Sequence, residues 1–541
     1  MLKKFISSFI AVAVFVLSLT AFADGGDMGG GDSGSDSSSV EQGDYAYLIS
    51  TDGTYEGETY TSSGDNENAL RVDGATVTLD NITVNKSGGA TENAETSDFY
   101  GMNAALLATN GATVTITNST VTSAAQGGNG IFSYGTGTTV TVSDTQITTT
   151  ADNSGGIQTT GGGTTYAYDL TISTSGSSAA AIRSDRGGGT VVVDGGTYTS
   201  NGYNSPAIYS TADITVSDAE LTANNSEALV VEGANSINLT DCIVSGNMDD
   251  EMGSSSDENV HNVMIYQSQS GDAATGTSYF TMTGGTLTSN NGDVFYVTNT
   301  DAVISLSGVT IVNNDDEGAL FTISGNSASH NWGTAGENGA TVTLTIDNTE
   351  LEGDINVDTV STLDLSLTGG TEFTGTVNIF ENADGGTAVD DNAVVTIDED
   401  STWTLTGNCV ITSLTNNGTI NYNGYTITLA DGTELSGDSD DSGSSTEDGN
   451  TDGDTDGSDT ATEITDVSVT ESTDGLTVTV EAQNPENGII IAAGYADGVL
   501  IDIAEAEDGT ALLSQDCEKV KVFIWDSLDG MNPLCTAYTS E

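Results

Sequence analysis

The feature of this sequence that most constrains its fold is a short pattern that recurs through most of its length. The pattern reads GATVTLDNITV, GATVTITNSTV, GTTVTVSDTQI, ADITVSDAEL and VISLSGVTI at successive places. We define the last apolar residue of each copy as its pivot, and most successive pivots are 22 to 26 residues apart. A period of this length is typical of a repeat protein, in which each unit packs against its neighbours. The pivots are Val84, Val121, Ile147, Ile172, Tyr198, Leu221, Val244, Leu287, Ile311, Leu351 and Phe373.

Three residues before every pivot stands Asn, Asp or Gly, the residue types that most readily adopt a positive φ. This position predicts a tight corner between two short strands, because the flanking residues alternate β-branched with polar side chains. A third short strand precedes the pair in segments such as ALRV, AIRS and AIYS. The predicted corner residues are Asn81, Asn118, Asp144, Asp169, Gly195, Asp218, Asp241, Gly284, Gly308, Asn348 and Gly370.

Three short strands in each unit predict one rung of a right-handed parallel β-helix. Rungs stack about 4.8 Å apart around one continuous core, so residues 45–435 have room for roughly 15 rungs in a rod on the order of 70 Å long. Cys242 falls at a small core position, where we expect a buried thiol. The predicted fold class is all-β: a right-handed parallel β-helix, followed by a small β-sandwich module over residues 463–541.

In period and corner chemistry, residues 45–435 resemble the pectin-lyase-like superfamily. More narrowly, they resemble the Thr- and Asn-rich, adhesin-like or carbohydrate-binding β-helices that anaerobic Gram-positive bacteria export. The segment VKVFIWDSLDGMNPL resembles part of a small β-sandwich module at the C-terminus of many clostridial secreted proteins. These resemblances imply an adhesin-like binding protein with an accessory, immunoglobulin-like module that has no catalytic role.

The remaining segments predict export. Lys3 and Lys4, an apolar run and the site Ala21-Phe22-Ala23 predict a signal peptide over residues 1–23. Residues 24–44 are predicted to be a disordered Gly/Ser/Asp-rich segment, and residues 436–462 an acidic Ser/Gly/Asp linker. No later run of apolar residues is long enough to span a bilayer, so we expect no membrane insertion. The expected location is outside the cell, either secreted or associated with the cell surface.

Charge limits the partners. The chain has 8 Lys and Arg against 80 Asp and Glu, a net charge of −72. Such a surface repels phosphate backbones, so we expect no nucleic-acid partner. It favours divalent cations. The two cysteines of the C-terminal module, Cys517 and Cys535, leave a disulfide and two separate thiols as alternatives.

One calcium motif occurs in the linker. The spacing D-x-D-x-D-G-x₅-E places alternate carboxylates and a distal Glu where an EF-hand loop has its Ca²⁺ ligands. Asp459, however, occupies a place where an apolar residue is usual, and an Asp- and Gly-rich tract produces this spacing by chance. The sequence leaves both interpretations open. The candidate ligands are Asp452, Asp454, Asp456 and Glu463.

The third strand of each rung supplies the candidate binding surface. In AIRS, Ile182 faces inward, so Arg183 faces outward by strand alternation. A column that mixes aromatic rings with arginine suits a glycan, which offers flat C–H faces and, in uronates, carboxylates. The expected column is Arg71, Leu107, Phe132, Gln158, Arg183, Tyr209, Val230, Tyr296 and Phe321. The candidate ligand-binding residues are Arg71, Phe132, Arg183, Arg186, Tyr209 and Tyr296.

The alternative is that this face lies under a loop and that the arginines neutralise local carboxylates such as Asp185 or Asp194. Insertions at residues 86–103, 246–262 and 325–339 interrupt the repeat, and loops on a rigid scaffold often carry function. The sequence alone does not place them.

Three function classes remain. The favoured one is a non-catalytic protein that binds a polysaccharide or another surface ligand. The runner-up is a calcium-dependent, pectate-type polysaccharide lyase, for which Arg183, Asp185 and Arg186 supply suitable residue types, although the W-I-D-H and R-x-P-x-x-R patterns of that family are absent. Recurrent Thr-x-Thr pairs raise ice binding as a third class, but aromatic residues interrupt the expected column.

Overall fold

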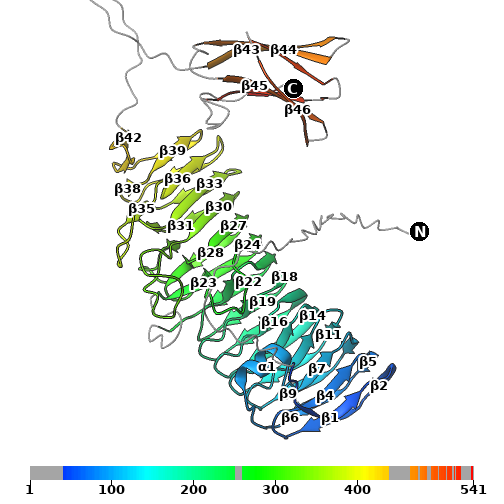
Figure 1. Cartoon of the computed structure of the whole chain (residues 1–541). Helices are drawn as coiled ribbons and strands as arrows, with labels where there is room; N and C mark the ends of the chain where they lie inside the picture. Colours follow the sequence, from blue (N-terminus) through cyan, green and yellow to red (C-terminus); the bar gives the residue numbers. More distant parts are fainter. Residues whose placement is uncertain are drawn as a thin grey trace, which may run out of the picture. The chain divides into compact units, whose positions relative to one another are not determined.

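The computed structural model of the chain describes residues 40–249 and 259–437, and the segments 463–472, 475–483, 489–496, 499–506, 509–514, 517, 519–525 and 538–539. The predicted signal peptide lies outside these residues. The described chain is almost entirely β-strand and divides near residue 441 into two compact units. The first is a stack of short parallel strands (Figure 1). The second contains two antiparallel sheets, so the predicted all-β fold class is confirmed.

Sheet A supplies one strand to each rung and has 16 strands, whose order in space follows the order in the chain. All its neighbours pair in parallel except the last two, which form an antiparallel end to the stack. Its strands are β1 (Asp44–Ile49), β4 (Glu67–Asp73), β7 (Leu106–Thr109), β10 (Ile131–Tyr134), β13 (Ile157–Thr160), β15 (Ile182–Ser184), β17 (Ile208–Ser210), β20 (Leu229–Glu232), β23 (His261–Tyr266), β26 (Asp293–Thr298), β29 (Phe321–Ile323), β32 (Ile355–Asp358), β35 (Val377–Phe380), β38 (Cys409–Val410), β41 (Thr426–Thr428) and β42 (Glu434–Ser436).

Sheet B has 22 strands and forms the other sides of the rungs. The strands before the corners are β2 (Gly53–Glu56), β5 (Thr76–Asp80), β8 (Thr113–Thr117), β11 (Thr139–Ser143), β14 (Gly163–Thr174), β16 (Gly189–Ser200), β18 (Asp213–Ser217), β21 (Ser236–Thr240), β24 (Thr277–Thr283), β27 (Asp301–Ser307), β30 (Thr341–Asp347), β33 (Thr362–Thr368), β36 (Ala393–Ile397) and β39 (Ser413–Asn416), of which β14 and β16 continue through the corner. The strands after the corners are β3 (Thr59–Ser62), β6 (Thr83–Lys86), β9 (Thr120–Ser123), β12 (Gln146–Thr149), β19 (Glu220–Ala223), β22 (Ile243–Gly246), β25 (Thr286–Ser289) and β28 (Thr310–Asn313). Sheet C takes the place of this second series near the C-terminal end, with β31 (Glu350–Glu352), β34 (Glu372–Thr374), β37 (Thr402–Thr404) and β40 (Thr419–Asn421).

The pivots stack on one another in the predicted register. Val84 pairs with Val121, and the ladder continues from rung to rung as far as Ile311. Ten of the eleven pivots are buried, and Ile311 packs against the same continuous core from a partly exposed position. Cys242 is fully buried, as expected, and burial raises the pKa of its thiol.

All eleven predicted corner residues have a positive φ, between 45° at Asn348 and 81° at Gly370. Side chains with a Cβ clash in this left-handed region, and Asn, Asp and Gly tolerate it best. The corner chemistry that was read from the sequence therefore has a conformational cause at every position.

Asp218 tests this cause, because its φ is 51° and its side chain is exposed. We expect Asp218→Ala to lower the free energy of unfolding by about 1 kcal/mol, since the Cβ of Ala is sterically strained in the left-handed region. Asp218→Gly should cost nothing or stabilise slightly, because Gly adopts this conformation freely. Denaturant midpoints of the two variants give the comparison. Equal losses in both would assign the effect to a side-chain contact and not to φ.

The insertion after β6 carries helix α1 (Ala94–Tyr100), which folds over sheet A (Figure 1). Asn93 caps its start by accepting a hydrogen bond from Thr96 N, and Gly101, with φ of 80°, ends it. No helix in the described parts of the chain has the length and apolar character needed to cross a bilayer.

The second unit consists of two antiparallel sheets that share one apolar core. Val478 and Leu513 come to this core from the first sheet, and Ala492 and Val522 come from the second. The first sheet contains β43 (Glu463–Ser472), β44 (Gly475–Gln483) and β47 (Thr510–Leu513). The second contains β45 (Ile489–Ala496), β46 (Val499–Glu505), β48 (Lys519–Trp525) and β49 (Tyr538–Thr539).

Candidate functional site

The outward column of sheet A exists, with one addition and one correction. Met264, which the sequence-based column omitted, lies between Val230 and Tyr296. Phe321 was wrongly placed in the column, because it pairs with Phe295 in the core and Thr322 pairs with Tyr296 instead. The alternation itself is continuous: Leu320 occupies the place of the small residue that precedes the first core residue in other rungs, such as Ala181 before Ile182, so Phe321 takes the core position.

Most of this column is buried, which agrees with the alternative that this face is covered. Phe132 and Tyr296 are buried, and Arg71 is nearly so. Helix α1 covers the first part of the column, where the side-chain amide of Gln158 donates to Asp98 O at 2.6 Å. Arg71 donates to the side chain of Asn68 and to the backbone carbonyls of residues 42–44. Arg71, Phe132 and Tyr296 therefore lie within packed structure, and Tyr296 belongs to the same apolar cluster that Tyr209 packs against.

Arg183 is held between two carboxylates. Its Nη1 lies 3.0 Å from Asp98 Oδ1 on α1, and its Nη2 lies 3.0 Å from Asp185 Oδ2. The three side chains are only 12%, 9% and 7% exposed. Arg183 therefore neutralises Asp185, as the alternative interpretation held, and it also ties the insertion to sheet A.

One guanidinium shared between two buried carboxylates leaves an excess negative charge. Burial raises the pKa of Asp98, and it raises the pKa of Asp185 to about 7 against the opposing pull of Arg183. Burial alone would lower the pKa of Arg183, but the two carboxylates raise it. The guanidinium consequently stays protonated, and the triad is electrically neutral when one carboxyl group holds a proton.

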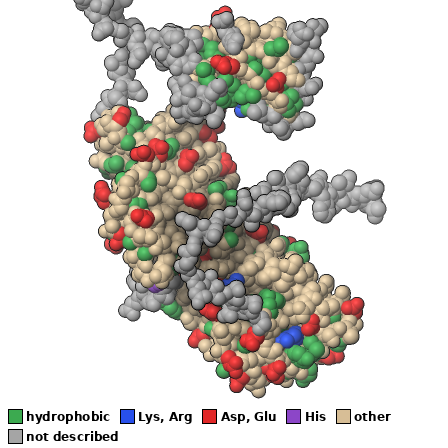
Figure 2. All heavy atoms as spheres, in the orientation of Figure 1, with side chains coloured by type: hydrophobic (Ala, Val, Ile, Leu, Met, Phe, Trp, Pro, Cys, Tyr) green, Lys and Arg blue, Asp and Glu red, His purple; other side chains and the backbone are tan. Residues whose placement is uncertain are grey.

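Arg186 makes a second link over the same face. Its Nη2 lies 2.7 Å from Asp272 Oδ1, and its guanidinium carbon lies 4.1 Å from the centre of the Phe99 ring on α1. The side chain is 46% exposed. Figure 2 shows how few Lys and Arg side chains stand among the many Asp and Glu side chains of this surface. Two of these scarce cations thus hold loops against the β-helix.

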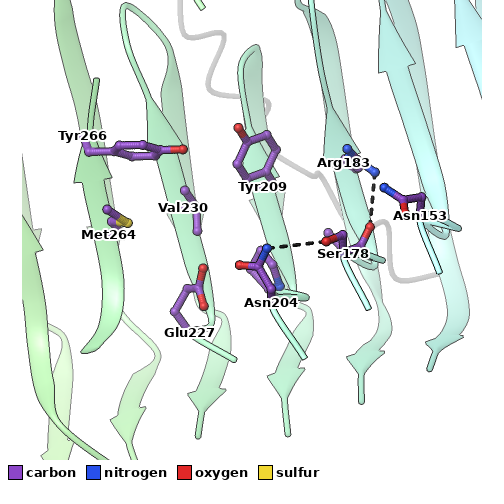
Figure 3. Close-up of a pocket in the computed structure, with 11 residues that line it drawn as sticks. Asn153, Ser178, Arg183, Asn204, Tyr209, Glu227, Val230, Met264 and Tyr266 are labelled. Atoms are coloured by element: carbon purple, nitrogen blue, oxygen red, sulfur yellow. Dashed lines mark hydrogen bonds between the residues drawn. The ribbon is translucent and has the colours of Figure 1, made fainter. Parts of the chain in front are cut away.

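A pocket of about 230 Å³ remains open between two covered parts of sheet A. At one end, Asp98 of α1 contacts Arg183 and Asn153. At the other end, Trp332 of the 325–339 insertion packs on Tyr266, with ring centres 4.7 Å apart. Figure 3 shows the lining residues on neighbouring strands of sheet A and on the turns that precede these strands. They are Asn153, Ser178, Ala180, Arg183, Asn204, Pro206, Tyr209, Glu227, Val230, Met264 and Tyr266.

The pocket combines an apolar floor with acidic groups. Behind the floor, the hydroxyls of Tyr209 and Tyr266 both donate to the buried carboxylate of Glu232, and Ser268 donates to its other oxygen. Burial raises the pKa of both tyrosines well above its usual value, so they stay protonated donors. Glu227 lines the pocket itself and is 5% exposed.

His261 lies fully buried on the strand next to β20. Its Nδ1 is 2.9 Å from Asn259 O, and its Nε2 has no hydrogen-bond partner among the described residues. Burial lowers the pKa of the imidazole, which keeps it neutral. His261 does not line the pocket, so we assign it no catalytic role.

Four of the six candidate residues are near this pocket: Arg183 and Tyr209 line it, Arg186 anchors the adjoining loops, and Tyr296 packs with the lining residues Met264 and Tyr266. Sequence reasoning missed Glu227. It stands two residues before the first core residue of β20, where the preceding rungs have Gly155, Ala180 and Pro206. A charged residue at a position of small uncharged ones is the signal that could have found it.

The predicted calcium ligands Asp452, Asp454 and Asp456 lie outside the described residues, and Glu463 begins β43. Within the described segments, no group of three or more His, Cys, Asp or Glu side chains is placed to hold a metal ion.

A protein-family model described as "Right handed beta helix region" matches residues 68–253. The matched range includes β4 to β22 and most of the pocket, and it agrees with the stack of parallel strands. No curated protein and no solved structure matched the chain. The comparisons therefore bear on the fold and leave the activity open.

Proposed function

We propose that this chain is a secreted or surface-associated β-helix protein that binds a polysaccharide without cleaving it. The pocket of about 230 Å³ on sheet A carries the proposal. It is smaller than the ~300–1,000 Å³ of pockets for drug-sized ligands, so it suits a single sugar ring of a longer chain. Val230, Met264 and the ring of Tyr209 offer surface to the C–H faces of a sugar, and Asn153 and Asn204 offer amides to its hydroxyls.

The pectate-type lyase remains the alternative, and the state of Arg183 speaks against it. Elimination from a uronate needs a base near the C5 proton and a cation that holds the carboxylate. Arg183 would have to supply one of these roles, but both of its terminal nitrogens are bound to Asp98 and Asp185, which raise its pKa. A guanidinium in this state neither accepts a proton nor has a free face for a ligand carboxylate.

The other parts of the proposal rest on the sequence. Residues 1–23 support export, and the two-sheet unit after residue 463 supports an accessory module resembling those of clostridial secreted proteins. Calcium binding by Asp452, Asp454, Asp456 and Glu463 stays a prediction for the linker.

The side-chain amides of the lining residues Asn153 and Asn204 provide the test of glycan binding at the pocket. Asn153 and Asn204 have φ of 56° and 50°, so replacement by Gly removes the amide without straining the backbone. Each lost hydrogen bond is worth about 1 kcal/mol, so Asn153→Gly/Asn204→Gly should weaken binding about 10- to 30-fold. A glycan array probed with the full chain identifies the ligand. Affinity gels that contain this ligand then compare binding by the double variant with binding by the unaltered chain.

Asn348→Gly is the matched control, because Asn348 also has a positive φ, of 45°, and lies outside the pocket. It should bind like the unaltered chain. Undiminished binding by the double variant would move the site elsewhere. Steady release of an unsaturated uronate product, abolished by Arg183→Ala, would establish the lyase instead.

A further inference from the structure

We infer that the pocket selects an uncharged sugar ring and that Glu227 excludes uronic acids from it. The inference rests on the proposed glycan binding and adds the chemical class of the ligand. It departs from the expectation, drawn from the sequence, that arginines on this face would receive a uronate carboxylate.

The charge balance around the pocket is negative. Arg183 is the one Lys or Arg among the residues that line it, and Asp98 and Asp185 already balance its positive charge. Arg186 is engaged with Asp272. Glu227 lines the cavity, and the Glu232 carboxylate lies behind Tyr209 and Tyr266. Among the residues that line the pocket, no cation is left to compensate a carboxylate on a ligand.

Glu227 is built to meet a hydrogen-bond donor. It is 5% exposed, and its Oε2 accepts a hydrogen bond from Ser226 at 2.5 Å. Among the described residues Ser226 is its only hydrogen-bond partner, so Oε1 remains available on the pocket side. Figure 3 shows the carboxylate beside Asn204. A carboxylate only accepts hydrogen bonds, and sugar hydroxyls are the donors that an uncharged ring brings.

A uronate in the same place would bring a second anion against Glu227. Like charges a few ångströms apart repel strongly where solvent is excluded, and the apolar floor of Val230 and Met264 offers no screening. We therefore expect a uronate to bind at least tenfold more weakly than the matching neutral sugar.

The experiment uses pairs of polymers that share a backbone and differ in charge at C6. The probes are methyl-esterified and de-esterified homogalacturonan, β-1,4-glucan and β-1,4-glucuronan, and β-1,4-mannan and polymannuronate. The full chain should bind a neutral member and discriminate at least tenfold against its acidic partner. Glu227→Gln should reduce that ratio to within about threefold by raising the affinity for the acidic member, because it removes the like charge.

Glu220→Gln is the matched control, because it removes the same charge from an exposed position on β19. Its discrimination should equal that of the unaltered chain. Circular dichroism and the melting temperature of Glu227→Gln show whether it folds. If Glu227→Gln does not fold, the salt dependence of the unaltered chain provides the test. Added salt screens charge, so it must reduce the ratio of neutral to acidic affinity if repulsion causes the discrimination.

The outcomes separate the two proposals. An acidic member bound as tightly as its neutral partner, or a ratio unchanged by Glu227→Gln, overturns the inference and leaves glycan binding intact. If the chain binds no member of any pair and no glycan on the array, the proposed function itself fails.

Discussion

Arg183→Ala is expected to release α1 from sheet A at a cost of about 3–5 kcal/mol near pH 8, because removal of one partner leaves buried charges uncompensated. Arg183 bridges Asp98 and Asp185, and all three side chains are nearly excluded from solvent. Near pH 5 the cost should be smaller, since both carboxyl groups can then take up protons. The expected change is confined to the insertion and its contacts.

Hydrogen exchange of residues 94–101 measures the effect directly. Protection of these amides should fall by at least two orders of magnitude, because each 1.4 kcal/mol corresponds to about a factor of ten. Arg186→Ala is the matched control: its ion pair with Asp272 is exposed and should be worth no more than about 1 kcal/mol. Unchanged exchange in Arg183→Ala, or equal effects of the two variants, would contradict this account of the ion pairs.

The stability of α1 against sheet A should fall as pH rises from about 4 to about 7. Burial raises the pKa of Asp185 to about 7 in the folded chain, whereas an unfolded Asp titrates near 3.9. The folded state holds a proton that the unfolded state has released, so the stabilisation is complete below the unfolded pKa and is lost as pH passes the folded pKa. Each unit of difference between the folded and unfolded pKa is worth about 1.4 kcal/mol, so the stability of α1 against sheet A should change by a few kcal/mol.

Asp185→Asn isolates this effect, because it leaves Arg183 and Asp98 as one neutral pair. Exchange of the α1 amides, corrected for the intrinsic pH dependence of exchange, should change much less between pH 4 and 7 in the variant than in the unaltered chain. The many other carboxylates of the surface titrate in both proteins, so their contribution cancels in the difference. A pH profile of the same slope in both would exclude Asp185 as the titrating group.

The sequence predicted the β-helix well because its regularity is local. A corner such as Asn118 needs a positive φ, and a pivot such as Val121 must face inward three residues later, so both appear in every rung. The same logic placed Arg183 beside Tyr209 across neighbouring strands. It failed at Phe321, because Leu320 fills the place that a small residue such as Ala181 holds in other rungs, and the register was therefore read one residue out.

The site was less predictable because it depends on contacts that no repeat encodes. Asp98 reaches Arg183 across 85 residues, and Asp272 reaches Arg186 across 86. The insertions gave no sign of which face they would cover, so the sequence left open whether the column of outward residues was exposed or covered. Glu227 differs from the small residues at the same position of earlier rungs, but only the folded chain shows it inside a pocket.

Helix α1 also changes how the stack should unfold. In a simple solenoid each rung couples only to the next, and rungs can fray one at a time from an end. Helix α1 breaks this rule, since its backbone and side chains accept hydrogen bonds from Gln42, which precedes β1, and from Gln158 and Arg183 on β13 and β15. A helix of seven residues thus ties non-adjacent rungs together, so the N-terminal third should open as one cooperative block while rungs beyond the helix fray singly.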